Sequence, residues 1–504
     1  MYYIYDFIVV PLYKKWQFQK YPNVMVSKRF IPLFGDFLEF AQNIEKGKAY
    51  YDHIRYEAKE MVNYDLRVVF EGNSVAVKAV SLQARKELQS LIPNKIDRFP
   101  FYKGFARIIL DSCVMKRSTK GNMERLKLFL NELSMKSSSK YLPTMVLAIQ
   151  NVMSHWKQDK TIGAVLQMNE YTFAAFNMVL FGKNIDTMTG KMIPYHMRDG
   201  SIKDMSFKDT FFEIVHDHIV SFLHPATSLA PFLSKYNLIN PFKRDHHNLN
   251  QFKAYIKEMI SKTDDENSIC RRILAKSKID KNDLVGDFVG FIFAGAETAS
   301  HCLTVALYHL KKYPEVLEKL MKHLADNGFN KYEDNYNNYT LEKISDLDYL
   351  TYVIKESLRI DGPAIQSLSY QCYEDVTVCG VPLKKGQEVR FEQLAIHYDE
   401  NEWKKPFEFI PERFDPESEY YGKPGAEGKN RTPLSHVPFS FGSRVCAGSS
   451  FAMLELKVGL TYMLTHMDFD VDQEFMAKEG VGFAVGSEIE LEMHIKKIKH
   501  SVVS

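Results

Sequence analysis

The loop that decides the fold reads Phe439-Ser440-Phe441-Gly442-Ser443-Arg444-Val445-Cys446-Ala447-Gly448, with one cysteine two residues after a cation. Gly442 and Gly448 permit positive φ and a close approach of the backbone to a flat ligand, so amide N–H groups can point at the sulfur. A helical pattern resumes at Ser449, and a helix N-terminus favours an anionic sulfur. The pattern indicates a thiolate presented to a metal. The alternative is an inert core cysteine, the usual state of a free thiol.

The spacing Phe-x-x-Gly-x-Arg-x-Cys-x-Gly resembles the haem-binding signature of the cytochrome P-450 superfamily at all five fixed positions. The resemblance implies that Cys446 is the axial thiolate ligand of the iron of haem b, where electron density from sulfur promotes O–O cleavage. It implies that Phe439, Gly442 and Gly448 shape the cofactor loop and that Arg444 neutralises an acidic group of the haem.

Length and composition agree with one large domain. The 504 residues are 45% hydrophobic, and no linker, repeat or low-complexity tract divides them. A net charge of +2 gives no overall field for nucleic acid, so no nucleic-acid partner is expected. Six dispersed cysteines form no disulfide framework and no zinc-type pair, which suggests a reducing compartment.

The N-terminal segment is apolar and aromatic but interrupted by Asp6 and Pro11, and it is shorter than the about 20 apolar residues that span a bilayer. Basic and aromatic residues follow at 14–20, a composition typical of a membrane interface. We therefore expect residues 1–20 to form a membrane-interface segment and residues 21–504 to form the haem-thiolate catalytic domain. The alternative is an aromatic element packed on the domain.

The hydropathy pattern predicts a mainly helical fold with small β-sheets. A hairpin is expected at 67–77 around Gly72-Asn73, and helical periodicity dominates from Ser81 to about Lys281. Strand character returns at Val376–Val378 and Gln387–Phe391, and residues 489–496 alternate as a half-buried strand.

A long buried helix is expected around Asp287–His301. Its acidic and histidine residues would be costly at the centre of a bilayer, so a membrane span is disfavoured. Ala294 and Gly295 are small enough for a planar cofactor to lie against the helix. Glu297 and Thr298 supply an acid beside a hydroxyl, which suits a proton relay to iron-bound oxygen in a dry pocket. Ala-Gly-x-Glu-Thr resembles the family's oxygen-activation motif. The alternative is a structural threonine bonded to the i−4 carbonyl.

A third motif is Glu356-x-x-Arg359, on a helix expected from about Tyr349 to Ile360. Any exposed helix could carry such a pair at little energetic gain. In the family, however, the pair forms a buried triad with an arginine from a Pro-Glu-Arg-Phe segment, which here is Pro411–Phe414. The resemblance implies that Glu356, Arg359 and Arg413 are scaffold residues and not catalysts.

The sequence departs from the family at two cofactor contacts. Many members hold a haem propionate with a tryptophan and a basic residue on an early helix, but the tryptophans here are Trp16, Trp156 and Trp403. Lys127 or Arg125 is the candidate for the charge. A further arginine expected after the Glu-x-x-Arg helix is missing from Ser367–Gln371.

The resemblance implies a monooxygenase that inserts one oxygen atom of O₂ into an apolar organic substrate and reduces the other to water. The chain has no dinucleotide fingerprint after a strand, so electrons are expected from a separate NADPH-dependent flavoprotein reductase. That partner is expected on the thiolate side, near Arg444, Lys127 and Lys457. The expected location is the cytosolic face of the endoplasmic reticulum membrane.

Two other activities remain open. A haem-thiolate isomerase or dehydratase would need no external electrons, and a non-catalytic haem sensor or carrier would turn nothing over. The retained Glu297-Thr298 pair favours the monooxygenase, because only that reaction needs the relay. An apolar cavity is expected near four segments, Phe99–Phe105, Phe211–Leu229, Phe293 and Val485–Ser487.

Overall fold

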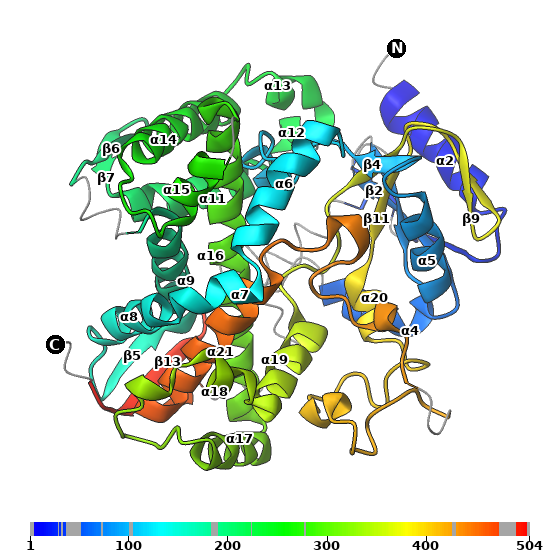
Figure 1. The fold of residues 1–504 in the computed structure, drawn as a ribbon. Coiled ribbons are helices and arrows are strands. Elements are labelled where there is room, and N and C mark those ends of the chain that lie inside the picture. The colour runs from blue at the N-terminus through cyan, green and yellow to red at the C-terminus, as the bar shows by residue number, and fades with distance from the viewer. Residues whose placement is uncertain are drawn as a thin grey trace.

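A computed structural model describes residues 5–28, 30–31, 34–36, 52–71, 74–99, 104–182, 190–222, 224–276, 279–425, 430–472 and 490–500. Helices dominate these ranges, and the strands form small sheets, as the sequence predicts. Figure 1 shows most of the long helices gathered on one side and the largest sheet on the other.

The helices longer than ten residues are α6 (Lys120–Glu132), α8 (Leu142–Met153), α9 (Ala164–Phe181), α11 (Phe207–Phe222), α14 (Phe242–Lys262), α16 (Lys281–Lys312), α17 (Pro314–Asp326), α19 (Asp348–Asp361) and α21 (Ser449–His466). Shorter α-helices are α2 (Val10–Phe18), α4 (Asp52–Met61), α5 (Leu82–Leu91), α7 (Met135–Ser138), α12 (Pro225–Leu229), α13 (Pro231–Lys235), α15 (Ile269–Lys276), α18 (Leu341–Ser345) and α20 (Gln393–His397). Single turns include η1 (Tyr5–Val9), η2 (Gly104–Arg107), η5 (Pro411–Phe414) and η7 (Gly442–Arg444).

The largest sheet has six strands in the order β1 (Val24–Val26), β2 (Leu66–Glu71), β3 (Ser74–Ala79), β11 (Glu388–Phe391), β8 (Tyr370–Cys372) and β4 (Ile96–Arg98). The predicted hairpin is confirmed, because β2 and β3 pair antiparallel; its turn at Gly72-Asn73 lies outside the described residues. The smaller sheets comprise β9 (Val376–Val378) with β10 (Val381–Leu383), β6 (Ile193–His196) with β7 (Ile202–Met205), and β12 (Met467–Val471) with β13 (Glu492–Ile498) and β5 (Lys160–Gly163).

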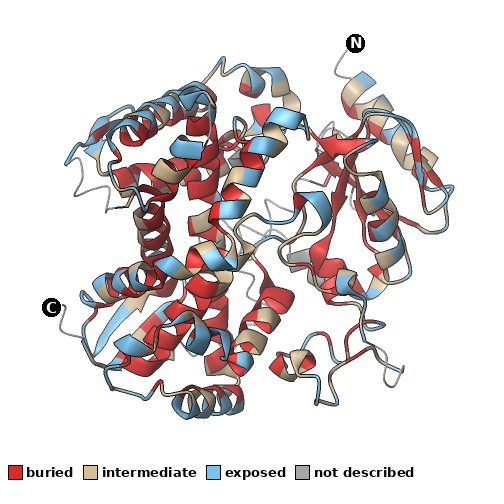
Figure 2. Ribbon diagram, in the orientation of Figure 1, coloured by how far each residue is buried: buried red, intermediate tan, exposed pale blue. Residues whose placement is uncertain are grey.

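The predicted buried helix is α16, which runs longer than the motif alone indicated. Asp280 caps its N-terminus by accepting a hydrogen bond from the Asn282 amide, and Pro314 begins the next helix. By length and apolarity α16 could cross a membrane, but 83% of its most apolar window is buried inside the protein. Its neighbours α9, α14, α19 and α21 cover it, so it is the central core helix (Figure 2).

The N-terminal segment packs on the domain along one side and is exposed along the other. Phe7 and Phe18 are each 1% exposed, and Phe18 joins the apolar cluster of the large sheet, so one side of this segment packs on the domain. The opposite side leaves large apolar residues in solvent: Tyr5, Val9, Leu12, Tyr13 and Trp16. Their spacing follows the helical repeat, so they lie along one exposed stripe.

Candidate functional site

The predicted thiolate loop leaves its cysteine accessible. Cys446 is exposed, whereas four of the other five cysteines are buried and Cys379 is intermediate. Protein nevertheless surrounds the sulfur, so desolvation raises the pKa of the thiol. The backbone amides of Gly448 and Ser449 point at the sulfur and act in the opposite direction. α21 begins at Ser449, so the sulfur also lies at a helix N-terminus, as predicted.

The backbone of this loop has a positive φ at Gly442 but not at Gly448. Gly442 has a φ of 67°, in the region that favours glycine. Gly448 has a φ of −91°, so it does not use the positive φ that a glycine permits. The bend is instead shared with Ser440, whose φ is 62°. The Phe439 carbonyl accepts a 2.8 Å hydrogen bond from the Cys446 amide, which fixes the cysteine across the loop.

A short part of the central helix is accessible. Between Leu284 and Leu310, every residue of α16 is buried except Ala294, Gly295 and Thr298. α21, which follows the cysteine loop, packs against α16. The accessible residues therefore mark the place where a ligand can reach the helix. We call them the α16 window.

Within the window, Gly295 also has a packing role. A Cβ on Gly295 would lie 3.0 Å from the ring of Phe176, which belongs to α9. Its lack of a side chain therefore lets α9 approach α16 closely. Ala294 is exposed, so it remains the small residue against which a planar cofactor could lie.

The predicted acid and hydroxyl belong to consecutive residues of α16. Glu297 is buried, and this burial raises its pKa to about 7. Thr298 is partly accessible, and its hydroxyl donates a 2.7 Å hydrogen bond to the Ala294 carbonyl. The structural alternative predicted this hydrogen bond to the carbonyl four residues earlier. The hydroxyl oxygen can still accept a hydrogen bond, because the side chain is accessible. The pair thus combines a carboxyl that can hold a proton near neutral pH with a hydroxyl that can accept one.

Two arginines at this site are buried with unmet hydrogen-bonding capacity. Arg444 is 6% exposed, and its Nη atoms donate to the carbonyls of Lys116 and Cys113 at 2.7 and 3.3 Å. Arg98 is 5% exposed, and its Nη1 donates to the Leu368 carbonyl at 2.8 Å. In the described part of the chain, the Nε atom of each has no hydrogen-bond partner.

The sequence did not reveal Arg98, because strand pairing brings it to the site. β4 pairs with β8 so that Arg98 stands opposite Tyr370, with its guanidinium carbon 4.0 Å from the tyrosine ring centroid. The cation thus lies beside Ser367–Gln371, the segment from which an arginine was missing. Burial lowers the pKa of Arg98, and nearby Arg444 lowers it further. A bound carboxylate would relieve both effects.

Of the two candidates on α6, Lys127 is the one without an ion pair among the described residues, so it could serve as the predicted charge. Arg125 binds Asp287 of α16 through Nε and Nη2, at 2.7 and 2.8 Å, and is buried. Lys127 is exposed. Lys457 was wrongly expected on a docking face. It is 7% exposed and donates to the Ile344 carbonyl, and burial lowers its pKa to about 8.

The predicted triad contacts are present behind the thiolate loop. Arg359 binds Glu356 through two hydrogen bonds of 2.8 Å, and Arg413 donates to Oε1 of Glu356 at 3.0 Å. None of the three side chains is exposed. The Ile410 amide donates to the same carboxylate at 2.9 Å. The triad therefore ties α19 to the segment that leads towards the cysteine loop.

Of the expected cavity segments, Phe211 and Phe293 are described and buried. Residues 100–103, 223 and 485–487 lie outside the described residues.

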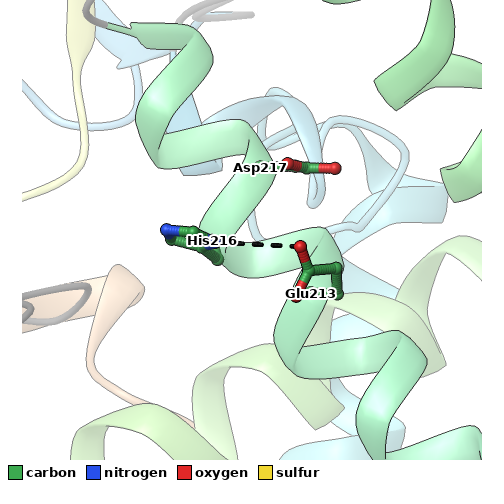
Figure 3. Close-up of side chains that lie close together, drawn as sticks. All are labelled: Glu213, His216 and Asp217. Atoms are coloured by element: carbon green, nitrogen blue, oxygen red, sulfur yellow. Dashed lines mark ion pairs between the residues drawn. The ribbon is translucent and has the colours of Figure 1, made fainter. Parts of the chain in front are cut away.

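A separate group on α11 has the residue types of a metal site. Glu213, His216 and Asp217 place ligand atoms within 4.8 Å of one another, and Figure 3 shows the 3.9 Å pairing of His216 with Glu213. Tyr195 and Arg198 already donate to the two oxygens of Asp217, at 2.7 and 2.6 Å. The buried carboxylate is neutralised by this network, which explains the cluster without a cation.

The site fits a haem on chemical grounds. An accessible sulfur with amide donors suits a soft iron ligand. Two buried guanidiniums, whose Nε atoms have no partner among the residues that the structure describes, suit the two carboxylates of haem b, and Ala294 offers a small surface for the ring. The fold and the site thus define a cysteine-ligated haem protein.

Comparison with known proteins gives the family. The family model described as Cytochrome P450 matches residues 27–487, so the chain belongs to the cytochrome P450 family, whose cofactor is haem b. It is 28% identical over 331 residues to human cytochrome P450 3A5, covering 64% of this chain and 61% of that protein. It is 25% identical over 337 residues to mouse cytochrome P450 3A41, covering 65% and 63%. The matched region spans less than two thirds of these relatives.

Proposed function

We propose that this chain is a haem-dependent monooxygenase, which inserts one oxygen atom of O₂ into an apolar organic substrate and reduces the other to water. The observation that carries the proposal is the position of Cys446, which is exposed and has two backbone amides pointing at its sulfur. Between Leu284 and Leu310, the central helix of this fold is accessible only at the α16 window. When bound, haem b supplies the iron that binds and activates O₂.

The chain's own residues hold the cofactor and move protons. Cys446 would ligate the iron, and Arg98 and Arg444 would bind the propionates, with exposed Lys127 as a further cation at the edge. Thr298 accepts and passes a proton at Oγ1, while its hydrogen bond to Ala294 fixes the hydroxyl. Glu297 replenishes that proton, because a pKa of about 7 allows it to bind and release protons near neutral pH.

Electrons would come from a separate NADPH-dependent flavoprotein reductase that docks on the thiolate side. We propose that residues 1–20 contact the endoplasmic reticulum membrane from its cytosolic side and that residues 21–504 form the catalytic domain. The support is the exposed stripe of Tyr5, Val9, Leu12, Tyr13 and Trp16 beside lysines, since this combination suits a membrane interface.

The test uses the full chain, haem-loaded, with a flavoprotein reductase, NADPH and a panel of apolar substrates. We expect substrate-dependent NADPH consumption with oxygenated product. Thr298→Ala should lower product formed per NADPH about 10-fold or more and release hydrogen peroxide, because general acid–base groups contribute at least that much. Thr298→Ser keeps the hydroxyl and should retain most of the yield.

Three outcomes would contradict the proposal. Turnover of a peroxide without NADPH would indicate an isomerase or dehydratase. Haem binding with no turnover, unchanged by Thr298→Ala, would indicate a sensor or carrier. Failure to bind haem would exclude all three functions.

A further inference from the structure

One face of α16 changes from buried to accessible between Gly290 and Ala294. Residues 286, 290, 294 and 298 recur at four-residue spacing, so they lie on one slowly turning face of the helix. Gly286 and Gly290 are buried, whereas Ala294 and Thr298 belong to the α16 window. The covered half and the open half of this face therefore meet within a single turn.

The covered half is closed by the chain that follows η2. A Cβ on Gly290 would lie 2.6 Å from both Cβ and Oγ of Ser112. A Cβ on Gly286 would lie 2.6 Å from Cβ of Asp111 and 3.0 Å from its carbonyl carbon. A side chain at either helix position would be too close to this segment, so the close approach of the segment requires glycine at both positions. We call Asp111–Lys116 the covering segment.

The covering segment is held at both edges of the site. The Cys113 amide donates to Oδ1 of Asp287 on α16 at 2.6 Å, and Arg125 holds the same carboxylate. On the other side, Arg444 donates to the carbonyls of Cys113 and Lys116 at 3.3 and 2.7 Å. The backbone of one residue, Cys113, thus joins the central helix to the arginine of the thiolate loop. The segment cannot withdraw from Gly290 without breaking buried, charge-assisted hydrogen bonds.

We infer that the contact between Ser112 and Gly290 is an end wall of the substrate cavity, and that it limits how far an apolar ligand extends along α16 towards the N-terminus of that helix. The inference rests on the proposed function, because it assumes that the ligand lies over the α16 window. It assigns compact apolar molecules as the substrate class, since an extended molecule along this face would meet Ser112.

The experiment measures two iron-binding probes of different length, imidazole and 4-phenylimidazole, by the shift each causes in the Soret band of the haem-loaded chain. Ser112→Gly removes the wall from the side of the covering segment. We expect it to increase the preference for 4-phenylimidazole over imidazole about 10-fold, the gain typical of newly available apolar contact. In Ser112→Gly/Gly290→Ala the methyl group refills the gap from the helix, so the preference should return towards that of the parent.

Gly459→Ala is the matched control, because its Cβ would meet Tyr171 and Leu303 in the core of the protein and not the covering segment. It should leave the preference unchanged. An unchanged preference in haem-loaded Ser112→Gly would overturn the inference, whereas absence of a Soret band in the parent would contradict the proposed function instead.

Thermal unfolding gives a second measurement that needs no ligand. Gly290→Ala alone should lower the unfolding temperature, and adding Ser112→Gly should restore most of the loss, because the two groups compete for one space. Independent effects of the two substitutions would show that Ser112 does not close against Gly290, and would also overturn the inference.

Discussion

Arg413 donates from Nε to Oε1 of Glu356 across 3.0 Å, and neither side chain is exposed. Arg359 binds the same carboxylate, so one anion serves two guanidiniums. Burial alone would raise the pKa of Glu356, but the two arginines outweigh it and hold the pKa below its usual value. Backbone carbonyls take the remaining donors, including those of His397 and Pro406. The network is satisfied only when all three members are present.

Removing one member of the triad should therefore be costly. We expect Glu356→Gln to lower the free energy of unfolding by about 3–5 kcal/mol, since it leaves two buried guanidiniums without their carboxylate. Urea denaturation followed by circular dichroism measures this difference. The comparison is Lys384→Ala, which breaks the exposed pair with Asp375 and should change stability little. Equal effects of the buried and exposed changes would argue against the triad as scaffold.

The iron ligand gives a spectroscopic prediction. Cys446→Ser replaces the accessible sulfur with a weaker ligand, so the ferrous–CO spectrum should lose its thiolate signature even if some haem remains bound. Cys379→Ser changes a cysteine in the turn between β9 and β10 and should leave that spectrum intact. A parental spectrum from Cys446→Ser would remove the basis of the site.

The two buried arginines make a prediction about haem retention. Arg98→Ala and Arg444→Ala should each speed transfer of haem to an apo-globin acceptor about 10- to 100-fold, because a hydrogen bond to a charged group contributes about 1.5–3 kcal/mol. Lys127→Ala should have a smaller effect, because solvent screens an exposed cation. Haem release at the parental rate from the Arg98→Ala variant would show that this guanidinium does not bind a propionate.

Much of the site could be predicted because its residues lie close together in the sequence. The loop around Cys446, the Glu297-Thr298 pair and the Glu356-x-x-Arg359 pair are each contained in a short motif with a fixed spacing. Helical periodicity also predicted α16, since a buried apolar run with few breaks extends well beyond its motif. Local spacing and local geometry determine these features together.

The rest depends on contacts between distant segments. Arg98 reaches Tyr370 through the pairing of β4 with β8, and nothing near Arg98 in the sequence indicates this. Lys457 occurs in a helix that is apolar on all sides, so its burial beneath the end of α18 depends on tertiary packing. From the sequence alone, Gly295 could be placed only at the cofactor surface. The position of Phe176 shows that Gly295 also allows the close contact between α9 and α16.

The last prediction concerns the acid of the relay and the pH at which it matters. Burial raises the pKa of Glu297 from 4.5 to about 7. Below pH 4.5 the carboxyl is protonated in both the folded and the unfolded chain, so its burial as an ion does not lower the free energy of unfolding. Between these values the unfolded chain releases its proton first, so stability falls as pH rises. Each pKa unit corresponds to about 1.4 kcal/mol, so the penalty reaches about 3 kcal/mol above pH 7.

Glu297→Gln removes this titration while keeping the size of the side chain. The unfolding free energy of the variant relative to the parent should therefore rise between pH 4.5 and 7 and stay level above that range. The same variant should lose product per NADPH, because an amide cannot replenish the proton passed through Thr298. Thr298→Ser serves as the control, since it changes no carboxyl and its stability relative to the parent should not vary with pH. A pH-independent difference for Glu297→Gln would place the pKa of Glu297 in the ordinary range and remove it from the relay.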